Sequence, residues 1–312
     1  MSENTPLKST STGFIVDQTD IWIDPREPVN CAIISHAHGD HAVPGSNIVY
    51  CTPNTAKLLY TRFRKFAQQV ITPKYHEPFV VEGITFKFVP AGHMLGSAQI
   101  VWERNGKTIV YTGDFKRQFN PTCEAFETAP CDIFITESTF AQPEKTHPSP
   151  EESIRQLSTY KDLNFIIGAY SLGKAQRITY LLNEYAPELR VMIHSKIVPY
   201  HKNYEEAGFL KAKWEPFQKQ VFKKERGIVY IVAPGVLQGQ KASPDYLRGM
   251  ASGWEHLQTG YELMFPISDH ADWFDLIRTI EESGAKQVYT IHGDGKLLKD
   301  HLSVSGLKID EL

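Results

Sequence analysis

Short runs of β-branched and aromatic residues, separated by polar turns, fill the first part of the chain. Such runs predict strands, because these side chains fit a pleated and half-buried surface. Asn105-Gly106 predicts a hairpin, since both residues tolerate positive φ. A helical spacing of apolar residues predicts a helix over 55–66. The expected strands are 14–16, 20–23, 32–34, 84–89, 99–102 and 108–111.

The pattern changes between about residues 150 and 250, where strands alternate with helices. Ser149-Pro150-Glu151-Glu152 predicts a helix start, with a cap residue, a proline at the first position and acids in the first turn. Alternating strands and helices predict a small parallel sheet. Further on, the pattern predicts a helix, a strand and a final helix after Pro266. The chain is therefore divided into residues 1–140, 141–265 and 266–312.

Composition and charge leave several functions open. The chain has 312 residues, of which 41% are hydrophobic and 22% charged, with a formal net charge of −3. These values are typical of a globular protein, and a local basic stripe or bound cations could still attract nucleic acid. The four cysteines form no C-x-x-C pair, the N-terminus has no apolar signal region, and no apolar run reaches 18 residues. We therefore expect reduced thiols, no membrane partner and a cytoplasmic location.

A cluster of metal-capable side chains follows one of the predicted strands. His36, His38, Asp40 and His41 lie within six residues, directly after the apolar segment that ends at Ile34. Imidazole and carboxylate are preferred ligands of Zn²⁺ and related divalent ions. The cluster predicts a metal site in the loop at the end of this strand.

Other candidate residues share this placement after predicted strands. His93 lies between glycines, Asp114 follows Thr112-Gly113, and His292 ends the strand that begins near residue 287. His270 lies in Ser268-Asp269-His270-Ala271-Asp272. Loops at strand ends gather into functional sites, so we expect these side chains to lie near the cluster.

The pattern His-x-His-x-Asp-His, followed by His93, Asp114 and His292, resembles the metallo-β-lactamase fold of binuclear hydrolases. The resemblance implies an α/β (α+β) fold, a four-layer αββα sandwich. It implies two divalent metal ions: Zn²⁺ suits the ligands, and Mn²⁺ or Fe²⁺ could occupy the same geometry. It also implies that Asp24 orients the ligand loop. By resemblance, His36, His38 and His93 hold one metal, Asp40, His41 and His292 hold the other, and Asp114 bridges them.

The 178 residues between Asp114 and His292 exceed what a simple hydrolase of this fold needs. The gap resembles the β-CASP branch, whose nucleases carry an inserted cap domain of alternating strands and helices. Glu137 and His270 match further marks of that branch. The chain resembles most the bacterial DNA-ligase-associated exonucleases, through segments along nearly its whole length. These segments include Thr136-Glu137-Ser138-Thr139-Phe140, Ser171-Leu172-Gly173-Lys174-Ala175-Gln176, Ala251-Ser252-Gly253-Trp254 and Ser268-Asp269-His270-Ala271-Asp272-Trp273.

The resemblance gives these residues roles. Asp40 belongs to the catalytic centre, and His270, held by Glu137, is the candidate general acid for the leaving 3′-oxygen. Backbone N–H groups and a lysine at a helix start could hold a phosphate. The candidates for phosphate contact are Ser171, Gly173 and Lys174, together with Ser252 and Gly253 by resemblance only.

The leading hypothesis is a DNA exonuclease that acts in DNA repair. An RNA-processing β-CASP ribonuclease and a small-molecule metallo-hydrolase are the alternatives. The implied partners are nucleic acid, DNA ahead of RNA, and a DNA ligase or helicase of the same repair system. A basic stretch over 211–226 contains Trp214, Phe217 and Phe222. It fits either single-stranded nucleic acid or a solvated helix whose rings lie in the core.

Overall fold

The computed structural model describes residues 5–293, 295–303 and 306–312. The chain forms two compact units, of which the first joins the residues up to Thr146 with His270–Leu312. The second unit is His147–Asp269. The sequence pattern placed the corresponding boundaries at residues 140 and 265. Each unit is described by itself below.

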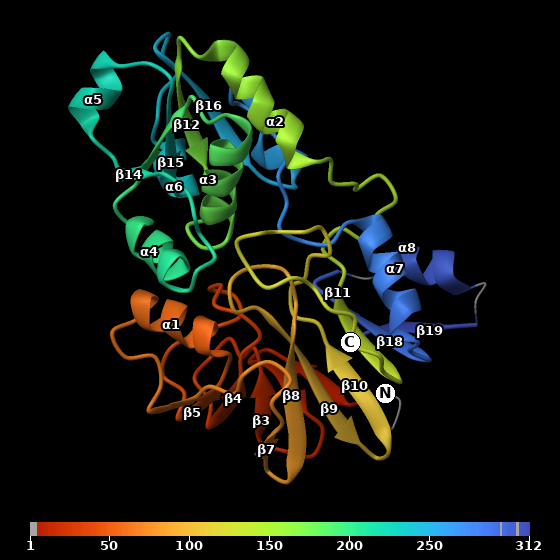
Figure 1. The fold of residues 1–312 in the computed structure, drawn as a ribbon. Helices are drawn as coiled ribbons and strands as arrows, with labels where there is room; N and C mark the ends of the chain where they lie inside the picture. The colour runs from red at the N-terminus through yellow and green to blue at the C-terminus, as the bar shows by residue number, and fades with distance from the viewer. Residues whose placement is uncertain (1–4, 294, 304–305) are drawn as a thin grey trace. The chain divides into compact units, whose positions relative to one another are not determined.

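The first unit contains two sheets (Figure 1). Among the described residues, one sheet has six strands in the order β1-β2-β3-β4-β5-β6, antiparallel from β1 to β3 and parallel from β3 to β6. The parallel pair β5 and β6 is joined by helix α1, because parallel neighbours require a crossover connection. The bounds are β1 (Leu7–Thr10), β2 (Gly13–Val16), β3 (Ile21–Ile23), β4 (Cys31–Ile33), β5 (Ile48–Tyr50), α1 (Pro53–Arg62) and β6 (Gln69–Ile71).

The other sheet has seven described strands in the order β19-β18-β11-β10-β9-β8-β7. The pairs from β7 to β10 are antiparallel and those from β10 to β19 are parallel. The bounds are β7 (Phe79–Val81), β8 (Ile84–Pro90), β9 (Ala98–Arg104), β10 (Lys107–Tyr111), β11 (Ile133–Glu137), α7 (Trp273–Ser283), β18 (Gln287–Ile291), α8 (Lys296–Leu302) and β19 (Lys308–Glu311).

Alternating side chains of the second sheet build two cores. In β10, Ile109 and Tyr111 pack into the layer between the sheets, whereas Val110 packs into the layer shared with α7 and α8. In β11, Phe134 likewise faces the helices. Successive strand residues point to opposite faces, so each strand contributes to both layers. With α1 on the crossover of the first sheet, the unit is an αββα sandwich.

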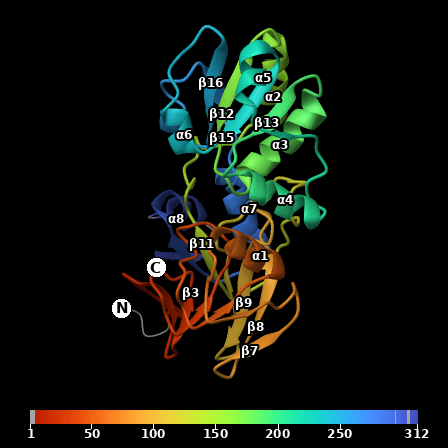
Figure 2. The ribbon, with the colours of Figure 1, turned by 90° about the vertical axis from the view of Figure 1, so that its left-hand side faces the viewer.

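The second unit is a parallel sheet with helices on both faces (Figure 2). In β12, Phe165 and Ile167 pack against helices α2 and α3, whereas Ile166 packs on the opposite face, where α5 and α6 contribute. The parallel sheet predicted from the alternation is confirmed: its described strands run β14-β13-β15-β12-β16-β17, and each neighbouring pair is parallel. The bounds are α2 (Pro150–Leu157), β12 (Asn164–Gly168), α3 (Lys174–Tyr185), β13 (Arg190–Ile193), α4 (Val198–Glu206), β14 (Glu215–Pro216), α5 (Lys219–Lys224), β15 (Ile228–Val232), α6 (Pro234–Gln238), β16 (Tyr246–Ala251) and β17 (Leu263–Phe265).

Two further predictions can be compared with the structure. The hairpin at Asn105-Gly106 is confirmed, and both residues adopt positive φ, 52° and 69°. In the basic stretch, Phe217 stacks on Tyr230 with 3.8 Å between ring centroids, and Phe222 is buried. These two rings therefore belong to the core and are not presented for base stacking. Within the described residues, the helices are all too short or too polar to cross a bilayer.

Candidate metal centre

Three strand ends of the first unit bring the metal-capable residues together. His36 follows β4, His93 follows β8, and Asp114 follows β10. The turn before Asp114 requires glycine: Gly113 has a φ of 55°, and a Cβ there would lie 2.7 Å from the Ser35 side chain. This close approach packs the Asp114 turn against the loop that carries the histidines.

One group consists of His36, His38, His93 and Asp114. The Nδ1 atom of His38 lies 3.2 Å from Nε2 of His36 and 3.1 Å from Nε2 of His93. Oδ2 of Asp114 lies 3.6 Å from the same nitrogen of His36 and 3.8 Å from that of His93. The ligand atoms of these four side chains lie within 4.8 Å of one another. They are the three histidines expected by resemblance to hold one metal and the aspartate expected to bridge.

These distances fit a divalent cation. With Zn–N bonds of about 2.0–2.1 Å, the ligand atoms of a tetrahedral site lie roughly 3.3 Å apart. One imidazole nitrogen carries either a lone pair or a proton, so Nδ1 of His38 cannot form good hydrogen bonds with both neighbours at once. A cation at the centre of the group would accept a lone pair from each nitrogen.

A second group also includes Asp114. His41, Asp114 and His292 place ligand atoms within 4.8 Å of one another, and Nε2 of His41 lies 3.5 Å from Oδ2 of Asp114. Asp40 reaches the edge of this group: its Oδ2 lies 3.8 Å from Nε2 of His41, and its side chain is 79% exposed. His292 has a left-handed backbone with a φ of 60°, a conformation that is sparsely populated outside glycine and concentrates at functional sites.

Asp24 fixes the orientation of two histidines. Its Oδ2 accepts hydrogen bonds from Nδ1 of His41 at 2.8 Å, from the Ser35 hydroxyl at 2.6 Å and from the Tyr111 hydroxyl at 3.0 Å. The Ser35 hydroxyl in turn lies 3.0 Å from Nδ1 of His36. These bonds engage Nδ1 of His41 and of His36, so that Nε2 of each ring is the nitrogen that faces the centre. Sequence reasoning found Asp24 and missed Ser35 and Tyr111; the adjacency of Ser35 to His36 was the available signal.

Burial and neighbouring charge set the ionisation of the centre in the protein alone. Burial, followed by the proximity of His41, holds the pKa of His36 well below its usual range, so this imidazole is neutral as a ligand must be. For His41, burial lowers the pKa, but Asp114 and the hydrogen-bonded Asp24 outweigh it and raise the value to about 10. Burial raises the pKa of Asp114, but the surrounding histidines, His41 first, hold it well below its usual range.

Glu137 and His270 form a pair next to this centre. The Oε2 atom of Glu137 lies 2.8 Å from Nδ1 of His270, and its Oε1 accepts a hydrogen bond from the Phe115 amide at 2.8 Å. The same His270 nitrogen lies 3.9 Å from Oδ2 of Asp114. Glu137 is buried whereas the His270 side chain is 26% exposed. The carboxylate is thus fully engaged in holding an imidazole that solvent can reach.

The residues predicted to contact phosphate belong to the other unit, and their polar groups have partners there. Lys174, the first residue of α3, is 4% exposed, and its Nζ lies 3.6 Å from Oδ2 of Asp269. The Gly173 amide donates to the Gln176 side chain, and the Ser252 hydroxyl accepts from the Trp254 amide. Ser171 and Gly253 are both half-buried.

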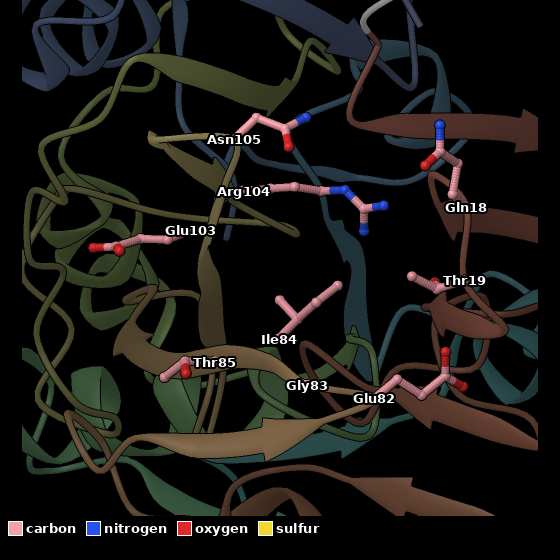
Figure 3. A pocket seen from close by; sticks show the side chains of 9 residues that line it. All are labelled: Gln18, Thr19, Glu82, Gly83, Ile84, Thr85, Glu103, Arg104 and Asn105. Atoms are coloured by element: carbon pink, nitrogen blue, oxygen red, sulfur yellow. The ribbon is translucent and has the colours of Figure 1, made fainter.

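A separate pocket of about 510 Å³ lies among three hairpin turns of the first unit (Figure 3). Arg104 extends across it, and Glu82 lies at its edge beside Thr19 (Figure 3). None of the nine lining residues was predicted from the sequence as a site residue. The pocket is thus distinct from the histidine groups.

The chain is similar to several known proteins. The sequence family described as "Beta-lactamase superfamily domain" matches residues 10–166. A protein named "Probable DNA ligase" from Opitutus terrae is 29% identical over 315 residues, which cover 96% of this chain and 30% of that protein. An "RNase J-like protein" from Methanocaldococcus jannaschii is 33% identical over 201 residues, or 55% of this chain and 48% of that protein.

A "5' exonuclease Apollo" from Rattus norvegicus is 29% identical over 195 residues, which cover 55% of this chain and 36% of that protein. The chain therefore spans between about a third and a half of the length of these three relatives. A solved structure of a protein of unknown function from Enterococcus faecalis aligns with a TM-score of 0.61 at 14% identity. That alignment covers 90% of this chain and 78% of the other, and it shows a shared fold.

Proposed function

The chain belongs to the β-lactamase superfamily, in its β-CASP branch, and on that premise we propose that it is a two-metal phosphodiesterase that cleaves nucleic acid. The specific activity that we propose is that of a DNA exonuclease in repair. The observation that carries the proposal is the shared Asp114 carboxylate. It belongs to both histidine groups and lies within 3.9 Å of the paired His270.

In this proposal, each residue has a defined task. His36, His38 and His93 hold one divalent ion, while Asp40, His41 and His292 hold the other, with Asp114 shared. Two such ions would polarise a phosphodiester and lower the pKa of water between them. Zn²⁺ suits these nitrogen and oxygen ligands, and Mn²⁺ or Fe²⁺ are the alternatives.

His270 has the geometry of a general acid. Glu137 occupies its Nδ1, which leaves Nε2 as the nitrogen that would deliver a proton to the leaving 3′-oxygen. Glu137 also stabilises the protonated imidazole, because its buried carboxylate is fixed by the Phe115 amide. A positioned acid of this kind contributes roughly 10²–10⁴-fold to a rate.

DNA is the proposed substrate, and a DNA ligase the proposed partner. Nearly all of this chain matches a segment that makes up 30% of a protein named as a probable DNA ligase. A nuclease segment within the same chain as a ligase would prepare ends that the ligase then joins. We therefore propose that this protein trims DNA ends for a DNA ligase, or for a helicase of the same system.

RNA cleavage is the second candidate, and the similarity to an RNase J-like protein favours it. The candidate metal centre does not distinguish the two substrates, since it would act on a phosphate that DNA and RNA share. Discrimination would require contacts to the 2′-hydroxyl.

We retain Ser171, Gly173, Lys174, Ser252 and Gly253 as proposed phosphate contacts, with Lys174 as the residue to test. A lysine that binds a phosphate contributes about one unit to the slope of log Kd against log salt concentration. Lys174→Met should therefore reduce that slope by about one for a single-stranded oligonucleotide. An unchanged slope with a loss of unfolding free energy would instead assign the lysine to its pair with Asp269.

The deciding experiment incubates metal-loaded protein with end-labelled single-stranded DNA, double-stranded DNA and matched RNA, each with and without a 5′-phosphate. A ladder of products from DNA alone supports the proposal. Cleavage of RNA alone moves the assignment to the second candidate. The Asp40→Ala, His41→Ala double variant is the control, and full activity in that variant would overturn the two-metal assignment.

A further inference from the structure

Two phenylalanine side chains in the first unit are exposed to solvent. Phe119 is 76% exposed and Phe274 is 64% exposed. An isolated exposed phenylalanine is ordinary on a protein surface. These two are unusual because each follows closely on a residue of the candidate centre. Phe119 lies five residues after Asp114, and Phe274 lies four residues after His270.

Hydrogen bonds join the two segments that carry these rings. The Ala271 amide donates to the Phe115 carbonyl at 2.7 Å. Farther along, the Arg117 guanidinium donates to Thr279 at 3.2 Å and to Glu282 at 2.7 Å, both on α7. The loop that leads to Phe119 therefore runs beside the helix that begins next to Phe274.

The backbone on both sides of Phe119 is fixed. Lys116 and Asn120 are buried, although Phe119 between them is not. The Asn120 side chain accepts hydrogen bonds from the Thr122 amide at 3.1 Å and the Thr122 hydroxyl at 2.7 Å. The next residue, Cys123, donates through its thiol to the Gly92 carbonyl at 3.4 Å, in the loop that carries His93.

The backbone that carries Phe274 is fixed as well. It lies in the first turn of α7, where Asp272 caps the helix by accepting a hydrogen bond from the Asp275 amide at 2.9 Å. The neighbouring Trp273 and Leu276 are buried and hold this turn against the sheet. Because both rings stand on fixed backbone, a flat ligand would lose little of its binding free energy to ordering them.

The exposed rings offer flat apolar faces, which suit a nucleobase, and the two arginines near them are already engaged. Arg278 lies one turn after Phe274 on the exposed side of α7, but it is paired with Glu282 at 2.8 Å. Arg117 is paired with the same carboxylate. Two guanidinium groups of this surface thus share one carboxylate that holds both, while two apolar rings face solvent.

We propose that Phe119 and Phe274 stack on unpaired bases of the strand whose end enters the candidate centre. This inference rests on the proposed function and deepens it, because it assigns a single-stranded or frayed end as the substrate. Every base has a π face, so stacking would hold the strand without selecting a sequence.

Binding without cleavage tests the inference. Fluorescence anisotropy in EDTA would give the Kd of the full chain for a labelled single-stranded oligonucleotide, and for the same strand with abasic sites. We expect Phe119→Ala and Phe274→Ala each to weaken binding of the base-bearing strand about tenfold. Binding of the abasic strand should not change, and Phe119→Tyr should restore binding because it keeps the ring. Tyr160→Ala, which removes an exposed ring from the second unit, is the matched control.

Equal losses on base-bearing and abasic strands would overturn the inference, as would unchanged binding in both alanine variants. Circular dichroism and bound metal content of each variant show whether it is folded. The outcome is separable from that of the proposed function. Cleavage by the wild-type protein with no preference for base-bearing strands refutes the stacking alone, whereas base-dependent binding without any cleavage refutes the nuclease alone.

Discussion

Buried histidines occur in both units, and they are used in opposite ways. In the second unit, His201 of α4 has a partner for each ring nitrogen: Gln176 lies 3.0 Å from Nδ1, and Thr179 lies 2.9 Å from Nε2. In the first unit, the nitrogens of His36, His38 and His93 face one another. Neutral donors and acceptors satisfy His201, whereas the converging nitrogens of the first unit fit a shared cation. Burial alone therefore does not mark a histidine as a candidate ligand, but convergence of ring nitrogens does.

The largest effect is expected at Asp114, the carboxylate that both histidine groups of the first unit share. Asp114→Asn keeps the size of the side chain but removes the charge that both histidine groups face. We expect cleavage to fall roughly a thousandfold or more, because this charge would hold both ions. Mass spectrometric metal analysis should find fewer than two ions per chain. His201→Asn is the control and should keep its metal content; if both variants keep two ions, the distinction between the histidines fails.

The next largest effect is expected at His270. His270→Ala should slow cleavage by about 10²–10³-fold, since the proposed proton donor is lost. Bound metal should remain near the wild-type level, and Glu137→Gln should slow cleavage less. Single-turnover rates combined with metal analysis would check this prediction. Loss of metal from the alanine variant would instead make His270 a ligand.

The third prediction concerns Asp24, because a substitution there changes how the proposed ligands are oriented without removing any of them. Asp24→Asn retains a residue that tolerates the observed φ of 44° but weakens the bonds to His41 and Ser35. We expect metal affinity to fall about 10–100-fold, measured by competition with a chelator. Tyr111→Phe removes only one of these bonds and should have a smaller effect. Equal affinity in Asp24→Asn and wild type would contradict the orienting role.

The smallest effect is expected at His201, and it depends on pH. Burial lowers the pKa of His201 to about 3, against 6.5 for an exposed histidine. As the pH falls below 6.5, His201 becomes protonated in the unfolded chain but stays neutral in the folded unit, so the free energy of unfolding falls. At pH 5.5 this loss is about 1.4 kcal/mol. Hydrogen exchange of α4 at pH 7.5 and 5.5 should show this loss in the wild type, and His201→Asn should reduce it.

Local patterns were sufficient for the elements whose signals are short in range. The hairpin at Asn105-Gly106 depends on two adjacent residues, and the strand before His36 on one apolar run. By contrast, β1 (Leu7–Thr10) was not predicted, because Leu7 is its one buried residue and the other three face solvent. Its place is set by pairing with β2, which a pattern along one segment does not reveal.

In the candidate site, too, some contacts could be expected from the sequence and others could not. The grouping of His93 and Asp114 with the first cluster could be expected because strand ends meet at one edge of a sandwich. The Tyr111 hydroxyl on Asp24 could not, since this contact joins residues 87 positions apart across the interior. The sequence did not predict the partner of Lys174 either, because Asp269 lies 95 residues later and comes close to it only in the folded unit.

The pair Glu137 and His270 has a consequence for how the protein is made. The two residues are separated by 133 positions, and the intervening chain forms the whole second unit. In the first unit, β11 pairs with β18, so that sheet cannot be completed before the last part of the chain is synthesised. At roughly 5–20 residues per second, a ribosome adds the intervening segment in about 7–27 s. During that interval the nascent chain holds His36, His38, His41 and His93 but neither His270 nor His292. If the proposed roles hold, most of the metal ligands are therefore synthesised before the residues that complete a nuclease.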